Sequence, residues 1–240
     1  MITSPQNEKL KLVRRLGRKR ARDADGLFVT EGEDLLEAGR ATGAEPLELL
    51  CAAGEGLGGT EVEPELLDGV AALGSGTRVI GVWRQRWAEE LEPPCIYLHG
   101  VSDPGNVGTI VRTASSLVGG TVVLGPGCAD PFGPRAVRAS MGAVFGQGLA
   151  KGEVAATPAP RAALVAHDGE PLESLGTPAT ICLGSEREGL PQAVIAECET
   201  RVTIPLRAGA ESLNVAAAAA IALQRISSPA QAKMGDSGDG

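Results

Sequence analysis

The sequence predicts an α/β fold whose second half is a mostly parallel sheet. Short, nearly continuous apolar runs alternate with segments of helical spacing, and a charged stretch at 84–94 interrupts this alternation. Strands buried on both faces read as continuous apolar runs, which is typical of parallel sheets covered by helices. We therefore expect two α/β domains, residues 1–88 and 89–228, joined by a linker that ends in Pro93-Pro94.

The first domain is predicted to begin with a basic helix and to continue as a small sheet with two helices. Helices are expected over 1–22, 31–39 and 64–73, with a glycine ending the second, and strands over 26–30, 47–52 and 78–83. In the second domain, strands are expected over 95–101, 121–124, 163–166, 180–183 and 201–206, and helices over 106–117, 135–145, 191–198 and 212–226. The Gly- and Ser-rich tail at 229–240 is expected to be disordered.

The charge distribution suggests a basic arm on an acidic body. The net charge is −8, but residues 1–22 hold eight basic side chains and one acidic side chain, which leaves −15 for the rest. Such asymmetry favours contact with a polyanion such as RNA, although a solvated helix face remains an alternative. The candidate RNA-binding residues are Lys11, Arg14, Arg15, Arg18, Lys19, Arg20 and, further along the chain, Arg138.

Several classes of protein and site are not expected. No run of about 18 apolar residues predicts a membrane span, and the N-terminus lacks the features of a secretory signal. The five scattered cysteines and two isolated histidines, His99 and His167, predict no metal site, and we interpret both histidines as structural. Reduced thiols favour the cytoplasm. Neither a dinucleotide-binding fingerprint nor a phosphate-binding loop is present.

Three polar, glycine-rich loops follow predicted strands, at 102–114, 183–190 and 204–216. Ligands of parallel α/β sheets bind at the carboxyl ends of the strands, so we expect these loops to meet. Their candidate catalytic residues are Asn106, Arg112, Glu186, Ser212 and Asn214.

Three of these candidates have a simpler interpretation. Asn106 is also placed to cap a helix, Arg112 to form a structural ion pair, and Glu186 to lie on the surface of a turn. Arg112 stands out because it lies on an otherwise apolar helix, and its guanidinium fork suits a phosphate.

Taken together, the loops resemble the motifs of the SpoU (TrmH-like) RNA ribose methyltransferases of the SPOUT class. The matching segments are 106–108 with 112–114, 183–186 with 189–190, and 204–205 with 212–216, and the stretch 138–143 is also similar. The resemblance covers residues 95–226. A weaker one links the N-terminal part, through 4–7 and 28–32, to the ribosomal-protein-like substrate-binding domain of many members.

The resemblance implies a C-terminal trefoil knot, although general topology rules would exclude one. It also implies S-adenosylmethionine as cofactor, and a homodimer with the site near its interface. The cofactor would be held largely by backbone at Leu183, Gly184, Ile204, Leu206 and Leu213.

The implied activity is S-adenosylmethionine-dependent methyl transfer to a ribose 2′-hydroxyl of structured RNA, with 23S rRNA favoured. Transfer to tRNA, a non-catalytic RNA-binding or assembly protein, and a self-protecting resistance enzyme are the alternatives. A guanidinium is charged at neutral pH, so we favour Arg112 as a clamp on the target phosphate and leave the general base open.

Overall fold

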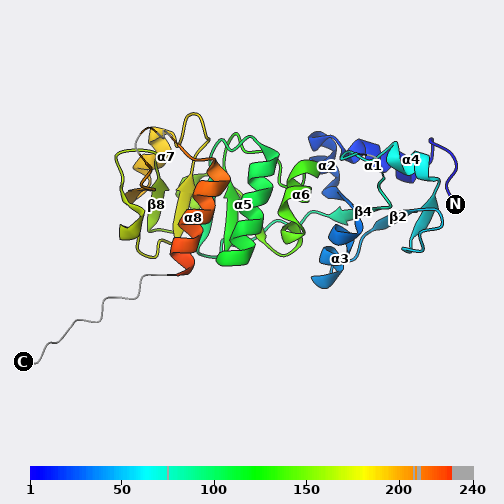
Figure 1. The fold of residues 1–240 in the computed structure, drawn as a ribbon, viewed down its shortest axis with the longest axis horizontal. Coiled ribbons are helices and arrows are strands. Elements are labelled where there is room, and N and C mark those ends of the chain that lie inside the picture. Colours follow the sequence, from blue (N-terminus) through cyan, green and yellow to red (C-terminus); the bar gives the residue numbers. More distant parts are fainter. Residues whose placement is uncertain (75, 208, 210–211, 229–240) are drawn as a thin grey trace, which may run out of the picture.

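The computed structural model describes residues 1–74, 76–207, 209 and 212–228, arranged as an elongated molecule with one sheet toward each end (Figure 1). The tail predicted to be disordered, 229–240, lies outside the described residues. None of the helices in the described part of the chain is both long and apolar enough to span a lipid bilayer.

The described N-terminal residues form a four-stranded mixed sheet in the order β1-β4-β2-β3. Its strands are β1 (Leu27–Glu31), β2 (Glu48–Ala52), β3 (Thr60–Val62) and β4 (Val79–Arg84), and its helices include α3 (Glu33–Ala41) and α4 (Pro64–Asp68). The sequence analysis missed β3, which pairs with β2 in parallel and is only three residues long. Helix α4 ends at Asp68, short of the predicted 73, and Glu31 then accepts hydrogen bonds from the backbone N–H groups of Ala72 and Leu73.

The predicted basic helix over 1–22 is in fact two helices, so that prediction is wrong in its extent. Helix α1 (Glu8–Leu16) is capped by Asn7, and α2 (Lys19–Asp25) begins after Arg18, which has an extended backbone. Leu10, Val13 and Leu16 bury one face of α1 against the N-terminal sheet. The helical spacing of these three residues thus reflects a packed face rather than a free arm.

The described C-terminal residues form a seven-stranded sheet in the order β7-β6-β5-β10-β8-β11-β9, with every neighbouring pair parallel. This confirms the predicted α/β fold with a largely parallel sheet. The strands are β5 (Cys95–Leu98), β6 (Thr121–Leu124), β7 (Gly148–Lys151), β8 (Arg161–Leu164), β9 (Glu170–Pro171), β10 (Thr180–Leu183) and β11 (Thr200–Thr203). The helices are α5 (Pro104–Leu117), α6 (Pro134–Ser140), α7 (Gln192–Ala196) and α8 (Val215–Ser227), with 3-10 turns at Ala143–Phe145, Val154–Ala156 and Leu172–Ser174.

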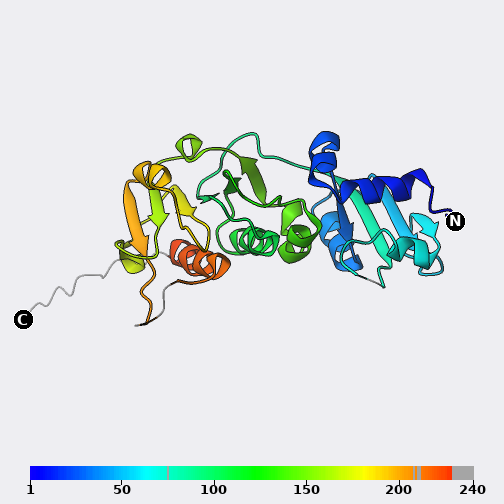
Figure 2. The same ribbon diagram turned by 90° about the horizontal axis from the view of Figure 1, so that it is seen from above.

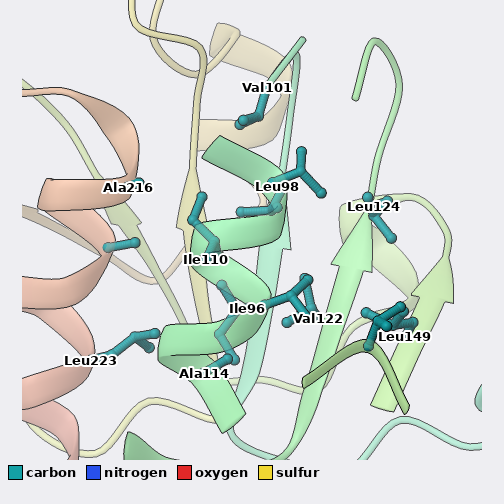
Figure 3. Close-up of a cluster of buried hydrophobic side chains, with 14 of the residues drawn as sticks. Ile96, Leu98, Val101, Ile110, Ala114, Val122, Leu124, Leu149, Ala216 and Leu223 are labelled. Carbon is teal, nitrogen blue, oxygen red and sulfur yellow. The ribbon is translucent and has the colours of Figure 1, made fainter. Parts of the chain in front are cut away.

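In most strands of this sheet, alternate side chains enter cores on opposite faces. Ile96, Leu98 and Val122 belong to the large core beneath α5 and α8, which lie side by side in both ribbon views (Figures 1 and 2). Figure 3 shows these strand residues meeting Ile110 of α5 and Leu223 of α8. On the other face, residues including Cys95, Tyr97 and Cys182 pack with Val194 and Ile195 of α7. Burial on both faces explains the nearly continuous apolar runs of the strands.

The helix predicted over 135–145 is broken, which corrects that expectation. Met141 and Gly142 have φ values of 49° and 90°, so α6 ends at Ser140 and a short 3-10 turn follows. A Cβ at Gly142 would collide with the Cβ of Ala38, so glycine lets this turn lie against α3.

Aromatic side chains join the two sheets. The ring of Phe28 from β1 lies 5.1 Å from that of Phe132 and 5.6 Å from that of Phe145. Trp83 of β4 packs edge-on against Phe145 with ring centres 4.7 Å apart. A buried ion pair between Arg22 of α2 and Asp130 lies at the same junction. The N-terminal sheet is therefore packed onto the parallel sheet through a shared core.

Candidate active site

Helix α5 begins at the carboxyl end of β5 and presents Asn106 in its first turn. Asp103 caps the helix, because its Oδ1 accepts a hydrogen bond of 2.9 Å from the backbone N–H of Asn106. The interpretation of Asn106 as the cap is therefore wrong, and its side chain can make other contacts. Two residues on, a Cβ at Gly108 would collide with Ala136 and Ala139, so this glycine allows α5 and α6 to pack closely.

The side chain of Asn106 joins the three loops. Its Nδ2 donates to Oε1 of Glu186 in the loop after β10, and its Oδ1 accepts a 3.1 Å hydrogen bond from Nδ2 of Asn214. Asn214 in turn caps α8, with its Oδ1 accepting from the backbone N–H groups of Ala216 and Ala217. Three residues that are up to 108 positions apart in the chain thus form one hydrogen-bonded network at the carboxyl edge of the sheet.

Beside this network lies a cavity of about 790 Å³ at the carboxyl ends of β8, β10 and β11. All five residues predicted to bind the cofactor lie in its wall, namely Leu183, Gly184, Ile204, Leu206 and Leu213. Glu186 and Ser212 also line it. Ser212 is exposed and does not cap α8, because Asn214 holds that position. Glu186 therefore belongs to both the cavity wall and the hydrogen-bonded network.

The loop after β10 is a tight turn that requires glycine at two positions. A Cβ at Gly184 would collide with the backbone of Gly189 and Leu190, and Gly189 has a φ of 66°. Ser185 closes the turn, because its carbonyl accepts from the N–H of Gly189 and its hydroxyl accepts from the N–H of Glu188. The turn fixes the direction in which Glu186 leaves the sheet.

Arg112 lies two turns into α5 on its exposed side and is not in the cavity wall. Within the described residues its guanidinium has no hydrogen-bond or salt-bridge partner, and only its backbone carbonyl is engaged, by the Ser116 hydroxyl. This does not support the alternative of a structural ion pair. The cation is available for a ligand outside the chain.

Strands β8 and β11 bring to the cavity residues that were not predicted from the sequence. His167 and Asp168 follow β8, and Arg201 and Thr203 belong to β11. His167 is exposed in the cavity wall, so its interpretation as a structural residue is wrong. Asp168 has a φ of 60° in a turn before Gly169. An Asp-Gly pair after an apolar strand is a turn signal, which predicts a turn at this position but not its place in the cavity wall.

The predicted RNA-binding residues lie on α1, α2 and α6, away from the cavity wall. Several have acidic partners: Lys11 pairs with Glu8, Arg15 with Asp25, Lys19 with Asp23, and Arg138 with Asp34. Arg14 donates to the carbonyl of Pro5, whereas Arg18 and Arg20 are exposed. Exposed ion pairs of this kind are weak and exchange readily with other charges.

Within the described part of the chain, no three His, Cys, Asp or Glu side chains gather in a way that could hold a metal ion. The arrangement is instead that of a small-molecule site: a parallel sheet with a concave, partly apolar cavity at its carboxyl edge and a few converging polar groups.

Comparison with known proteins identifies the family. The model of the SpoU rRNA methylase family matches residues 93–224, more than half of the chain, and the protein belongs to that family. The predicted class of enzyme, an RNA 2′-O-methyltransferase that uses S-adenosylmethionine, is thereby confirmed.

Relatives are similar over most of the chain. The 23S rRNA (guanosine(2553)-2′-O)-methyltransferase of Bacillus subtilis is 27% identical, over 92% of this chain and 96% of its own. The 23S rRNA (adenosine(1067)-2′-O)-methyltransferase of Streptomyces laurentii is 31% identical, over 80% of this chain and 73% of its own. The AdoMet-bound rRNA methyltransferase of Sinorhizobium meliloti superposes with a TM-score of 0.82 at 27% identity, covering 95% and 96% of the two chains.

The cavity fits S-adenosylmethionine in size and chemistry. Its volume lies in the range of about 300–1,000 Å³ typical of small-molecule sites. Leu183, Leu206 and Leu213 offer apolar surface to an adenine ring, and carboxylates of Glu186 and Asp168 lie at the wall, where they suit a cationic ligand.

Proposed function

We propose that the protein methylates a ribose 2′-hydroxyl of 23S rRNA in the cytoplasm. The observation that carries the proposal is the network of Asn106, Glu186 and Asn214 at the rim of the cofactor-sized cavity. The two 23S rRNA methyltransferases named above, from Bacillus subtilis and Streptomyces laurentii, favour rRNA over tRNA. A purely RNA-binding role is disfavoured, because it would not require this cavity.

The residues of the site have separable roles in this proposal. Bound S-adenosylmethionine supplies the electrophilic methyl group on its sulfonium. Transfer needs the ribose oxygen in line with that group, so positioning contributes most. Asn106 fixes Glu186 on one side and the start of α8 on the other, and Arg112 clamps the phosphate of the target nucleotide. Ser212 and Asn214 orient the ribose and cofactor from the third loop.

A homodimer and a trefoil knot are part of the same proposal. The outer faces of α5 and α8 present Thr109, Arg112, Ala217 and Ile221, and Ile221 is 42% exposed. A second copy packed here would cover Ile221 and bring a second chain close to Arg112. The knot is supported by two described residues that follow β11: Leu213 lies in the cavity wall together with the loop after β10, and Asn214 donates to Asn106 of α5.

The N-terminal part, residues 1–88, is proposed to be a ribosomal-protein-like RNA-binding domain attached to a methyltransferase domain at 89–228. Its four-stranded sheet and the basic helices α1 and α2 support this division. The exposed Arg18 and Arg20 would contact RNA phosphates. Lys19 would do the same by exchanging its weak ion pair with Asp23 for a phosphate.

Labelled methyl transfer tests the proposal. Protein is incubated with radiolabelled S-adenosylmethionine and total RNA from a strain that lacks rRNA ribose methylation, and label should enter rRNA. Arg112→Ala should abolish transfer with cofactor affinity, measured by calorimetry, nearly unchanged, because Arg112 lies outside the cavity wall. Wild-type protein that neither binds the cofactor nor labels RNA would refute the function. A collapse of cofactor affinity in Arg112→Ala would refute the clamp.

A further inference from the structure

A second concave site lies at the carboxyl ends of β6 and β7, where α2 meets the parallel sheet. It is a groove of about 370 Å³ whose wall includes Trp87, Lys19, Lys151 and residues of the loop after β6, among them Gly125, Pro126 and Pro131. We infer that this groove binds a nucleotide of the RNA substrate that flanks the methylated one, with its base on Trp87 and its phosphate at Lys19 and Lys151. The inference rests on the proposed function and adds a substrate contact to it.

Two contacts fix the position of Trp87, which prepares its ring as a stacking surface. The ring lies at 82° to that of Phe132 with ring centres 5.0 Å apart, and its Nε1 donates to Oε1 of Gln85 at 3.2 Å. One face is covered by the Nζ of Lys151, 4.5 Å from the ring centre. Lys151 is exposed, and base stacking on an aromatic ring is stronger than a cation–π contact at an exposed site. A base can therefore displace the lysine from this face.

The two lysines of the groove share one carboxylate. Nζ of Lys19 lies 3.0 Å and Nζ of Lys151 3.4 Å from the carboxylate oxygens of Asp23. Glu153 adds a second acidic group to the wall, whereas Asp130 is neutralised by the buried Arg22. Arg18 and Arg20, which flank Lys19 in the sequence, are also exposed. An RNA phosphate that approaches the displaced Lys151 meets cations already gathered in one place.

The groove and the active site lie at the same edge of the parallel sheet. The carbonyl of Pro126, in the groove wall, accepts a 2.9 Å hydrogen bond from the N–H of Gly100 after β5. On its other side, Gly100 packs against Ser185, which lines the cofactor cavity. Strands β6 and β10 both flank β5, so the nearest strands that border the two sites are about 10 Å apart. A short stretch of single-stranded RNA can span this distance.

Tryptophan fluorescence tests the inference, because the chain has only two tryptophans. Trp83 is 2% exposed in the core, so the variant Trp83→Phe reports on Trp87 alone. Titration of this variant with hexaadenylate should quench the fluorescence at least twofold, and an abasic oligomer of equal length and charge should not.

Lys151→Ala should weaken hexaadenylate binding about threefold or more and lower its salt slope by about one. Arg40→Ala, which removes an exposed cation of α3, is the matched control and should change neither value.

Methyl transfer separates this inference from the proposed function. Trp87→Phe should raise the KM for rRNA at least fivefold with kcat and cofactor affinity unchanged. Absent quenching, or equal quenching by the abasic oligomer, would overturn the groove even if rRNA is methylated. Base-dependent quenching by a protein that methylates no RNA would support the groove while the proposed function fails.

Discussion

The ion pair between Arg22 and Asp130 connects the basic helices to the parallel sheet, and replacing Arg22 by methionine should destabilise the whole protein. Nε and Nη2 of Arg22 donate to Oδ2 of Asp130 at 2.9 and 2.7 Å, and Nη1 donates to the carbonyl of Leu16 at 2.7 Å. The two side chains are only 6% and 8% exposed. Removal of the arginine therefore leaves a buried carboxylate whose remaining hydrogen bond comes from the N–H of Phe132.

The expected loss in the free energy of unfolding is about 3–5 kcal/mol, which is the cost of leaving one member of a buried pair uncompensated. This is a large part of the roughly 5–15 kcal/mol by which domains are stable. For a chain of this size, about 2–4 °C is lost per kcal/mol, so the melting temperature should fall by roughly 6–20 °C.

Urea unfolding followed by circular dichroism measures this loss. Arg20→Met, on the exposed side of the same helix, is the control and should change stability by no more than about 0.5 kcal/mol. The double variant Arg22→Met with Asp130→Leu should recover most of the loss, since an apolar pair of similar volume often replaces a buried ion pair without cost. A loss below about 1 kcal/mol in the single variant, or no recovery in the double, would refute the reasoning.

Three further predictions concern the site and the core. Asn106→Ala should lower methyl transfer about 100-fold through misplaced loops while cofactor affinity stays nearly constant, and an unchanged rate would show that the network is dispensable. Gly184→Ala should weaken cofactor binding at least about tenfold in calorimetry, because its Cβ collides with the loop backbone; wild-type affinity would contradict this close approach. Burial raises the pKa of the Tyr97 hydroxyl to about 12, so the unfolded chain ionises first and stability should fall as pH rises from 10 toward 12. Tyr97→Phe should remove that part of the pH dependence in urea titrations, and an identical profile in the variant would argue against it.

The sequence located elements well where a signal is local. The apolar runs at 121–124 and 180–183 coincide with β6 and β10, because strands buried on both faces leave a continuous pattern. Local signals failed where a tertiary contact decides the backbone. Helix α6 ends because the chain turns at Met141 and Gly142 to pack against Ala38, a contact 104 positions distant in the chain that no local pattern records.

The same difference between local sequence signals and tertiary contacts applies to the site. Motif positions placed the five predicted cofactor residues in the wall of one cavity, since each loop follows a strand of the parallel sheet. The wall from His167 to Asp168 could not be assigned in the same way, because it becomes part of the cavity only when β8 lies between β10 and β11. Likewise, Arg22 is one of eight basic residues in the first 22, and only the fold distinguishes its buried role from the exposed ones.

The position of the transferred methyl group tests the central claim most directly. rRNA and tRNA labelled by the purified protein are digested to nucleosides, and the labelled products are identified by mass spectrometry. A single 2′-O-methylated nucleoside from 23S rRNA, absent with Arg112→Ala, is the predicted result. Label on a base, or in tRNA alone, would contradict the assignment of this site to ribose methylation of 23S rRNA.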